Sequence, residues 1–586
     1  MTSRQGKSFV EKSRFDRRAE LVRVARDRHA DIGFILGLSW RAKGKLAHLD
    51  YAGGLDTNKI RSRLARLAKF ALWEDRADDA GFPRDEKRDL PSLKDALLDS
   101  APVDVHHETV DRQERIYQRR LRGFAGIISQ IDTEALASFA LGIMQTRRNL
   151  TSDPDQDQSP LRLPRIRGPS LGSAHVFYSI AFYDAQTHES TKWIIKIPAN
   201  GTPDTWDKLS SKMLRTEALV LYMLRTETSV PVPEIIDADS SPHNELHVPY
   251  LIMEYVEGQP LDRVWFGEGG EDENRVRERK IKILRNLARA MLQLGKYEFD
   301  RGGAPVFDDD GAIVGAGPLR ELDVQAMVER WFDNENCEGV PLYAEIGTFG
   351  DPAEMYTAMI DRYQGNTEAN AGVDRLLHLL VGLIQEKREK KKFVLTHSDL
   401  SMRHILVSKQ GQIKAILGWD AARISPKSMG NESYPRWLVR DFNPFIWRWL
   451  PAPEFWRSSY EEPQANRVED APWVLRELRD EYAKILMELK EQQGIDADRN
   501  TADVKLTKQS LFALSLDVAA RDPRCRAAIL RKILDKCSRA SEEFEFTWIV
   551  EALGNGRELG EYKRKCLEKN IEELVNRGYV RGAIVR

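Results

Sequence analysis

The sequence has few cysteines and no long apolar run. Four cysteines are scattered over 586 residues without a CxxC pair. Neither a disulfide framework nor a cysteine zinc site is therefore expected, and a reducing compartment is predicted. No stretch of about 18 residues is continuously apolar, so no membrane span is predicted. The net charge of −2 balances 89 basic against 91 acidic residues and gives no bulk attraction to nucleic acid.

The N-terminus lacks the apolar core of a secretory signal. Its many arginines are typical of a mitochondrial transit peptide, whereas Glu11, Asp16 and Glu20 are not. A cytoplasmic location is the default expectation, and a mitochondrial one stays open. This basic segment fits either an arm that binds a protein partner or an ordinary solvated helix face.

Composition divides the chain into five segments. Residues 151–160 contain two prolines, clustered acids and no apolar residue, which is typical of a linker. Beyond it the hydrophobic period changes from 3.6 towards 2, which predicts strands, and after residue 258 it becomes helical again, with one long helix predicted over residues 276–298. The predicted domains are a helical N-terminal extension (1–150), the linker (151–160), a β-rich lobe (161–257), a mainly helical lobe (258–450) and a helical C-terminal region packed on or continuing that lobe (451–586).

Four separated pieces follow one another in the order that phosphoryl transfer requires. A glycine turn at 168–173 precedes Lys196 in an apolar strand, and Glu217 follows 21 residues later in a predicted helix. The last piece is Asp399 within His397–His404. Kinases need a lysine on the phosphates, a glutamate that orients it and a carboxylate that accepts the hydroxyl proton. Each piece alone has an ordinary explanation, such as a hairpin loop or a snorkelling lysine. Their combination indicates a phosphotransferase.

These motifs resemble the aminoglycoside phosphotransferase family, whose protein-kinase-like fold is shared by choline kinases. The resemblance covers roughly residues 165–450 and is greatest to the group found in filamentous fungi. It implies an α+β fold of two lobes, a small antiparallel sheet followed by a mainly helical lobe, with helical extensions. The matching stretches are Trp193–Pro198, Val230–Ile235, Tyr250–Gly258, Leu284–Phe299, Val314–Leu319 and Leu395–Pro426.

The resemblance also implies roles for individual residues. Lys196 would contact the phosphates of ATP, and Glu217 would pair with it. Asp399 would be the catalytic base towards the hydroxyl of an unidentified small molecule, and His397 would support its loop. The remaining nucleotide-binding positions are Gly172 and Ser173 in the glycine turn, and Glu254 and Val256 in the hinge.

Two positions depart from the family pattern. The family has asparagine five residues after the catalytic aspartate, where this chain has His404. The family's later aspartate, its main metal ligand, is replaced by Gly418. Mg²⁺ prefers oxygen ligands in tight octahedral geometry, so an imidazole and a missing side chain suit it poorly. Asp420 is the candidate replacement for the metal ligand missing at residue 418, because residues two apart on a strand point to the same face.

Two functions stay open at this point. The loss of both metal ligands predicts a pseudokinase that keeps a nucleotide-binding or scaffold role. The retention of Lys196, Glu217 and Asp399 predicts an active ATP-dependent transferase instead. An Asp420 carboxylate that points away from the cleft between Lys196 and Asp399 would rule out its replacing the lost metal ligand.

Overall fold

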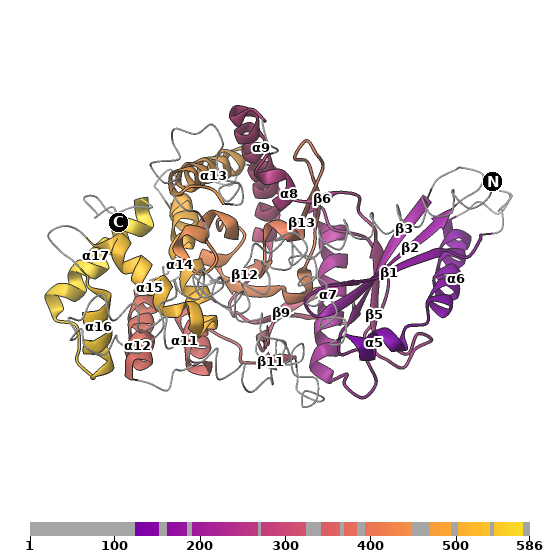
Figure 1. Ribbon diagram of the computed structural model, residues 1–586, viewed down its shortest axis with the longest axis horizontal. Coiled ribbons are helices and arrows are strands. Elements are labelled where there is room, and N and C mark those ends of the chain that lie inside the picture. Colours follow the sequence, from indigo (N-terminus) through magenta and orange to yellow (C-terminus); the bar gives the residue numbers. More distant parts are fainter. Residues whose placement is uncertain are drawn as a thin grey trace, which may run out of the picture. The chain divides into compact units, whose positions relative to one another are not determined.

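The computed structural model describes residues 124–151, 161–183, 190–267, 271–323, 342–363, 368–383, 393–447, 449, 469–493, 502–538 and 544–577. The chain divides into two compact units, Met1–Leu121 and Arg122–Arg586, and every element named below belongs to the second (Figure 1). This unit begins with helices α5 (Ala125–Gln130) and α6 (Thr133–Thr151), which the sequence analysis placed in the N-terminal extension. The basic N-terminal segment and residues 152–160 of the predicted linker lie outside the described residues.

The small lobe is a five-stranded antiparallel sheet in the order β1-β2-β3-β5-β4. Apolar residues alternate along β2, so that Val176, Tyr178 and Ile180 are buried on one face. Helix α7 (Lys208–Glu227) begins after Asp207, whose carboxylate accepts hydrogen bonds from the first free backbone N–H groups. The strands are β1 (Arg165–Leu171), β2 (His175–Tyr183), β3 (Ser190–Pro198), β4 (Ile235–Asp239) and β5 (Tyr250–Glu254).

The large lobe holds two polar loops between short strands. One three-stranded sheet has the order β15-β12-β7 and the other the order β14-β13-β6. Residues 397–404 connect β12 to β13, and residues 417–422 connect β14 to β15, so each loop is held at both ends by a strand. The strands are β6 (Gln259–Pro260), β7 (Glu298–Phe299), β12 (Phe393–Thr396), β13 (Ile405–Val407), β14 (Ile413–Ile416) and β15 (Arg423–Pro426).

Helices pack around these short sheets. Helix α9 (Glu273–Leu292) buries Leu284, Leu287 and Met291 on one side, as its 3.6-residue pattern predicts. The other helices of the lobe are α8 (Asp262–Trp265), α11 (Pro352–Arg362) and α12 (Glu368–Gly382). Further strands are β8 (Ala304–Phe307), β9 (Ile313–Gly317), β10 (Arg320–Leu322) and β11 (Tyr343–Glu345). No helix in the described ranges is long and apolar enough to cross a membrane.

The C-terminal helices share the hydrophobic core of the large lobe. Helix α13 packs on α9, where Arg285 Nη2 lies 2.8 Å from Glu488 Oε2. Helix α14 packs on the 3₁₀ segments η5 (Lys427–Met429) and η6 (Arg436–Phe442), close to the loop 397–404. The five helices are α13 (Pro472–Gln492), α14 (Ala502–Arg521), α15 (Pro523–Cys537), α16 (Phe546–Gly554) and α17 (Glu561–Arg577).

The predicted fold class is confirmed, with two corrections to its elements. The helix expected over 276–298 ends at Leu292, because a 3₁₀ turn follows and residues 298–299 pair with β12 instead. The glycine turn expected over 168–173 is shorter than predicted. Strand β1 continues to Leu171 through a β-bulge, and only Gly172–Ala174 reverse the chain.

One close approach between helices gives a stability prediction. A Cβ at Gly372 of α12 would lie under 3.0 Å from the backbone oxygen of Val550 in α16, and a backbone atom cannot move aside cheaply. We expect Gly372→Ala to lower the free energy of unfolding by about 1–3 kcal/mol. Gly382→Ala is the matched control in the same helix, because nothing lies within 4 Å of its added Cβ. Urea unfolding measures both, and equal stability of the two variants would contradict the close packing.

Candidate active site

A lysine lies between two carboxylates where the small lobe meets the loop after β14. Lys196 Nζ donates to both carboxylate oxygens of Glu217 at 2.8 Å. It also lies 3.5 Å from Oδ2 of Asp420. Strand β3 supplies the lysine, α7 the glutamate and η4 (Trp419–Ala421) the aspartate. The Asp420 carboxylate therefore points into the cleft, towards Lys196.

The shared lysine sets the charge state of both acids. Burial, opposed by Lys196 and assisted by the charge of Asp420, raises the pKa of Glu217 to about 7. Burial also acts to raise the pKa of Asp420, but Lys196 and nearby histidines hold it well below the usual carboxyl range. The pKa of Lys196 is raised overall, because the two carboxylates outweigh the cost of burying its charge. One cation thus serves two carboxylates, and Asp420 stays ionised.

Two further side chains reach this cluster that the sequence analysis did not name. His175, at the start of β2, has its pKa lowered to about 3 by burial and by Lys196, so its ring is neutral. Burial, followed by Asp420 and Glu217, raises the pKa of the Tyr343 phenol in β11. His175 directly follows the Gly172–Ala174 turn, which was an available signal. Tyr343 lies in a strand of only three residues, which is too short to show a hydrophobic period in the sequence.

His397 ties the two loops together, as the resemblance implies. Its Nε2–H donates to the Leu417 carbonyl at 2.7 Å, and its ring contacts Trp419 edge-on with centroids 4.6 Å apart. Burial, and then the charge of His404, lower its pKa to about 4, so the ring is neutral. The Asp399 side chain, by contrast, is 62% exposed and open to solvent. The loop therefore presents a solvent-exposed carboxylate from a buried anchor.

The two departures from the family pattern are in direct contact. His404 Nδ1 lies 2.6 Å from the Asp399 carbonyl oxygen and 3.6 Å from Asp399 Oδ2. Gly418 has a φ of +82°, and a Cβ added there would lie 2.9 Å from His404 Cδ2. The imidazole therefore occupies the space that a side chain at residue 418 needs. His404 and Gly418 form one steric arrangement, which sequence spacing alone does not reveal.

The residues present do not fit a magnesium ion held in the way the family resemblance implies. Gly418 offers no ligand, and the His404 ring fills the space of the missing side chain. Asp420 reaches the cleft, but it does so as the partner of Lys196. Within the described ranges, no three His, Cys, Asp or Glu side chains form a group that could hold a metal ion.

The remaining predicted nucleotide positions lie on the small lobe. Gly172 and Ser173 are in the β1–β2 turn, where Gly172 N–H donates to the His175 carbonyl at 2.8 Å. The Glu254 side chain accepts from the Glu234 N–H at 3.3 Å, on the β4 side of the sheet, rather than pointing to Lys196. Val256 follows β5 and is half-buried. If Glu254 and Val256 form the hinge, their backbone groups, rather than their side chains, would contact the nucleotide.

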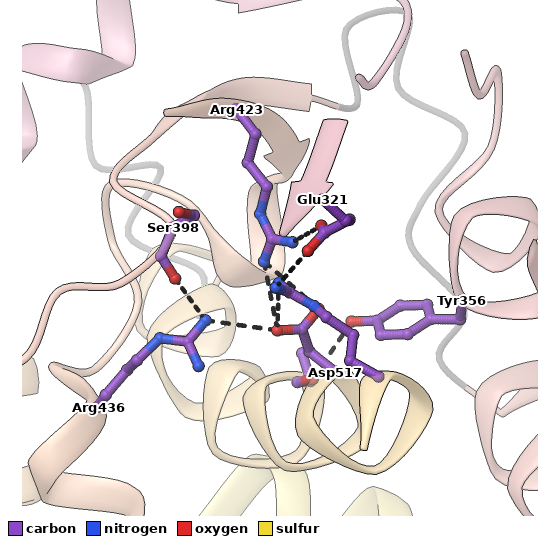
Figure 2. A network of polar contacts seen from close by, with 8 residues as sticks. Glu321, Tyr356, Ser398, Arg423, Arg436 and Asp517 are labelled. Carbon is purple, nitrogen blue, oxygen red and sulfur yellow. Dashed lines mark hydrogen bonds and ion pairs between the residues drawn. The ribbon is translucent and has the colours of Figure 1, made fainter. Parts of the chain in front are cut away.

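A buried acid outside the matching motifs supports the catalytic loop (Figure 2). Asp517 of α14 is 2% exposed and contacts three arginines. Arg423 and Arg521 bind it directly, and Arg436 links it to the Ser398 carbonyl through bonds of 3.4 and 2.7 Å. A lone acid directly after the largely apolar run 511–516 was the available signal. Helix α14 is thus coupled to the residue that precedes Asp399.

Known proteins share parts of this arrangement. A family model described as "Phosphotransferase enzyme family" matches residues 182–427. Curated relatives are named "Altered inheritance of mitochondria protein 9, mitochondrial". The one from Scheffersomyces stipitis is 23% identical over 25% of this chain and 23% of its own length. The one from Candida albicans is 21% identical over 47% and 44%. The chain thus spans less than half the length of the curated relatives it matches.

Two solved structures resemble the chain only weakly. A macrolide 2'-phosphotransferase type I is 12% identical, with a TM-score of 0.28, over 64% of this chain and 98% of that one. An aminoglycoside phosphotransferase from Alicyclobacillus acidocaldarius is 10% identical, with the same TM-score, over 72% and 98%. Likenesses at this level carry no argument about the site. Residues 182–427, which hold Lys196, Glu217 and Asp399, are similar to the phosphotransferase enzyme family.

Proposed function

We propose that this domain is a pseudokinase-like module, which binds a nucleotide at Lys196 and is impaired in phosphoryl transfer. The observation that carries the proposal is the His404 ring packed on Gly418, with 2.9 Å from Cδ2 to the position of an added Cβ. Stabilising the charge on the transferred group is a large part of catalysis. A site that has lost both expected ligand positions to one packed ring lacks much of that stabilisation.

Nucleotide binding is the activity that the remaining residues support. Lys196 is 5% exposed and held in place by Glu217, so its ammonium group is pre-positioned. A charge-assisted hydrogen bond of a buried lysine contributes about 1.5–3 kcal/mol. In this proposal ATP or a related nucleotide contacts Lys196, and the module acts through that binding or as a scaffold.

Nucleotide titration of Lys196→Met tests the binding. We expect ATP to bind the wild type and to bind Lys196→Met about 10-fold to 100-fold more weakly, from the lost charge-assisted bond. Lys212→Met is the control, because Lys212 pairs with Glu345 on the surface, away from the cluster. Isothermal titration calorimetry with and without Mg²⁺ measures all three proteins. Equal affinity in wild type and Lys196→Met would contradict the proposed site.

An active transferase is the second candidate, and the position of Asp420 favours it. Its carboxylate lies 3.5 Å from Lys196 Nζ and stays ionised, so the cleft keeps a carboxylate close to the lost ligand position. Asp399 would then accept the proton of a small-molecule hydroxyl. Metal-dependent ATP turnover that requires both Asp420 and Asp399 would establish this candidate over the first.

The cellular location is tested separately. The curated relatives carry "mitochondrial" in their names, which favours a mitochondrial location over the cytoplasmic default. Fractionation of cells that express the full chain with a C-terminal tag distinguishes the two. Recovery of the chain in the cytosolic fraction alone would contradict the mitochondrial location.

A further inference from the structure

A small cavity lies between the catalytic loop, the loop after β15 and helix α14. The centre of a water molecule can occupy about 20 Å³ of it, which exceeds the roughly 10–15 Å³ that one water needs. Apolar side chains of α9, η2 (Gln293–Lys296) and α14 form part of its wall. The polar lining residues include Thr396, His397, Arg423, Asn431, Ser433 and Arg436.

Three arginine side chains are grouped near the cavity. Arg423, Arg436 and Arg521 gather around two acids, Asp517 and Glu321 (Figure 2). Burial lowers the pKa of Arg423, and the neighbouring Arg521 and Arg436 lower it further. Three guanidinium groups thus share the carboxylates of Asp517 and Glu321, and the third nearby acid, Asp399, is 62% exposed to solvent.

Two buried polar atoms of the lining residues have no partner. Arg423 is 3% exposed, and its Nε is buried without a hydrogen bond. His397 is 5% exposed, and its Nδ1 is likewise unpaired, because Nε2 is the atom bound to Leu417. Arg436 makes its bonds through Nη2, which leaves its other nitrogens available. Buried polar atoms are nearly always satisfied by protein, water or an ion, so these two atoms indicate a bound water or ion beside them.

We propose that this cavity binds a small oxyanion of phosphate size. Arg423 and Arg436 would donate charge-assisted hydrogen bonds to its oxygens, and guanidinium groups suit phosphate geometry well. The neutral His397 ring would accept a hydrogen bond from the hydroxyl of hydrogen phosphate. The anion would give Arg423 and Arg436 a charged partner, which water cannot do. It would also fix Arg436, and through Arg436 the Ser398 carbonyl beside Asp399.

Inorganic phosphate is the probe that tests this site, with the full chain in each measurement. We expect potassium phosphate to raise the melting temperature above that in potassium chloride of equal ionic strength. The gain should persist in Lys196→Met, which separates this site from the nucleotide cleft. Glycerol phosphate is measured in parallel. Binding of both compounds identifies the phosphate group of a larger molecule as a ligand. Binding of inorganic phosphate alone identifies the free ion.

Arg436→Gln is the variant that should lose the effect. Its side chain is 25% exposed, so a folded variant is expected, and an amide can still donate to Ser398. Phosphate affinity should fall at least about 10-fold in Arg436→Gln and recover in part in Arg436→Lys, which restores the charge. Arg301→Gln, at an exposed loop contact, should bind phosphate like the wild type. Equal stabilisation by phosphate and chloride, or an unchanged affinity in Arg436→Gln, would overturn the proposal and leave a hydrated cavity.

Discussion

Gly418→Asp should lower the free energy of unfolding by about 1–3 kcal/mol in the wild type, and by clearly less in a His404→Asn background. The added Cβ meets the His404 ring at 2.9 Å, and the ring cannot turn away without breaking its 2.6 Å hydrogen bond to the Asp399 carbonyl. Asparagine at residue 404 removes the ring and the conflict. A double-mutant cycle by urea unfolding should therefore give a coupling energy of about 0.5–3 kcal/mol.

The control for this cycle separates the steric conflict from backbone strain. Gly418 has a φ of +82°, and any side chain there carries the cost of a left-handed conformation. Gly556 has a φ of +76°, and only a side-chain nitrogen of Arg375, at 3.9 Å, lies near its added Cβ. Gly556→Ala, compared with Gly418→Ala, thus reports the backbone cost without the ring contact and without a new ion pair to Arg375. Additive effects of the His404 and Gly418 substitutions would contradict the steric coupling.

Asp517→Ala should lower the free energy of unfolding by about 3–5 kcal/mol, because it leaves three arginines around a buried position without their acid. The pKa of Asp517 is held well below the carboxyl range by Arg423, Arg521 and Arg436, which outweigh the effect of burial. A depressed pKa contributes stability that is present at neutral pH and lost as the pH falls. The difference from the wild type should therefore narrow below about pH 4.

Chemical denaturation across that pH range measures the effect of Asp517. Glu561→Ala is the control in the same C-terminal region, because Glu561 is 82% exposed and pairs only with an exposed lysine. Such a surface pair contributes at most about 1 kcal/mol. Hydrogen exchange of residues 397–404 adds a second readout, since the link through Arg436 to Ser398 is expected to loosen. A loss below about 1 kcal/mol would contradict the buried network.

Local patterns in the sequence were enough to predict the elements that carry the site. The alternation around Lys196 predicted β3, and the apolar spacing near Glu217 predicted α7. Their ion pair followed from the family resemblance, and the structure has it at 2.8 Å. The approach of Asp420 to Lys196 was an open alternative, because a two-residue offset in a loop does not fix where a side chain points.

Other features depended on contacts between distant segments. The packing of His404 on Gly418 joins residues 14 positions apart across two strands, and neither residue alone signals it. Asp517 lies about 120 residues beyond Asp399, outside the matched family domain, so motif reasoning did not reach it. The helix predicted over residues 276–298 extends too far. Its last two residues form β7 instead, because they are hydrogen-bonded to β12, about 95 residues further on. Non-local pairing overrides local propensity in each of these cases.

Metal-dependent ATP turnover tests the central claim most directly. It is measured with Mg²⁺ and with Mn²⁺ on the wild type, on Asp399→Asn and on His404→Asn/Gly418→Asp. The account predicts that the wild type is no faster than Asp399→Asn, and that the double variant is faster by roughly 100-fold or more, the usual effect of one well-placed electrostatic group. Wild-type turnover that depends on the metal and is abolished by Asp399→Asn would contradict impaired catalysis and establish an active transferase.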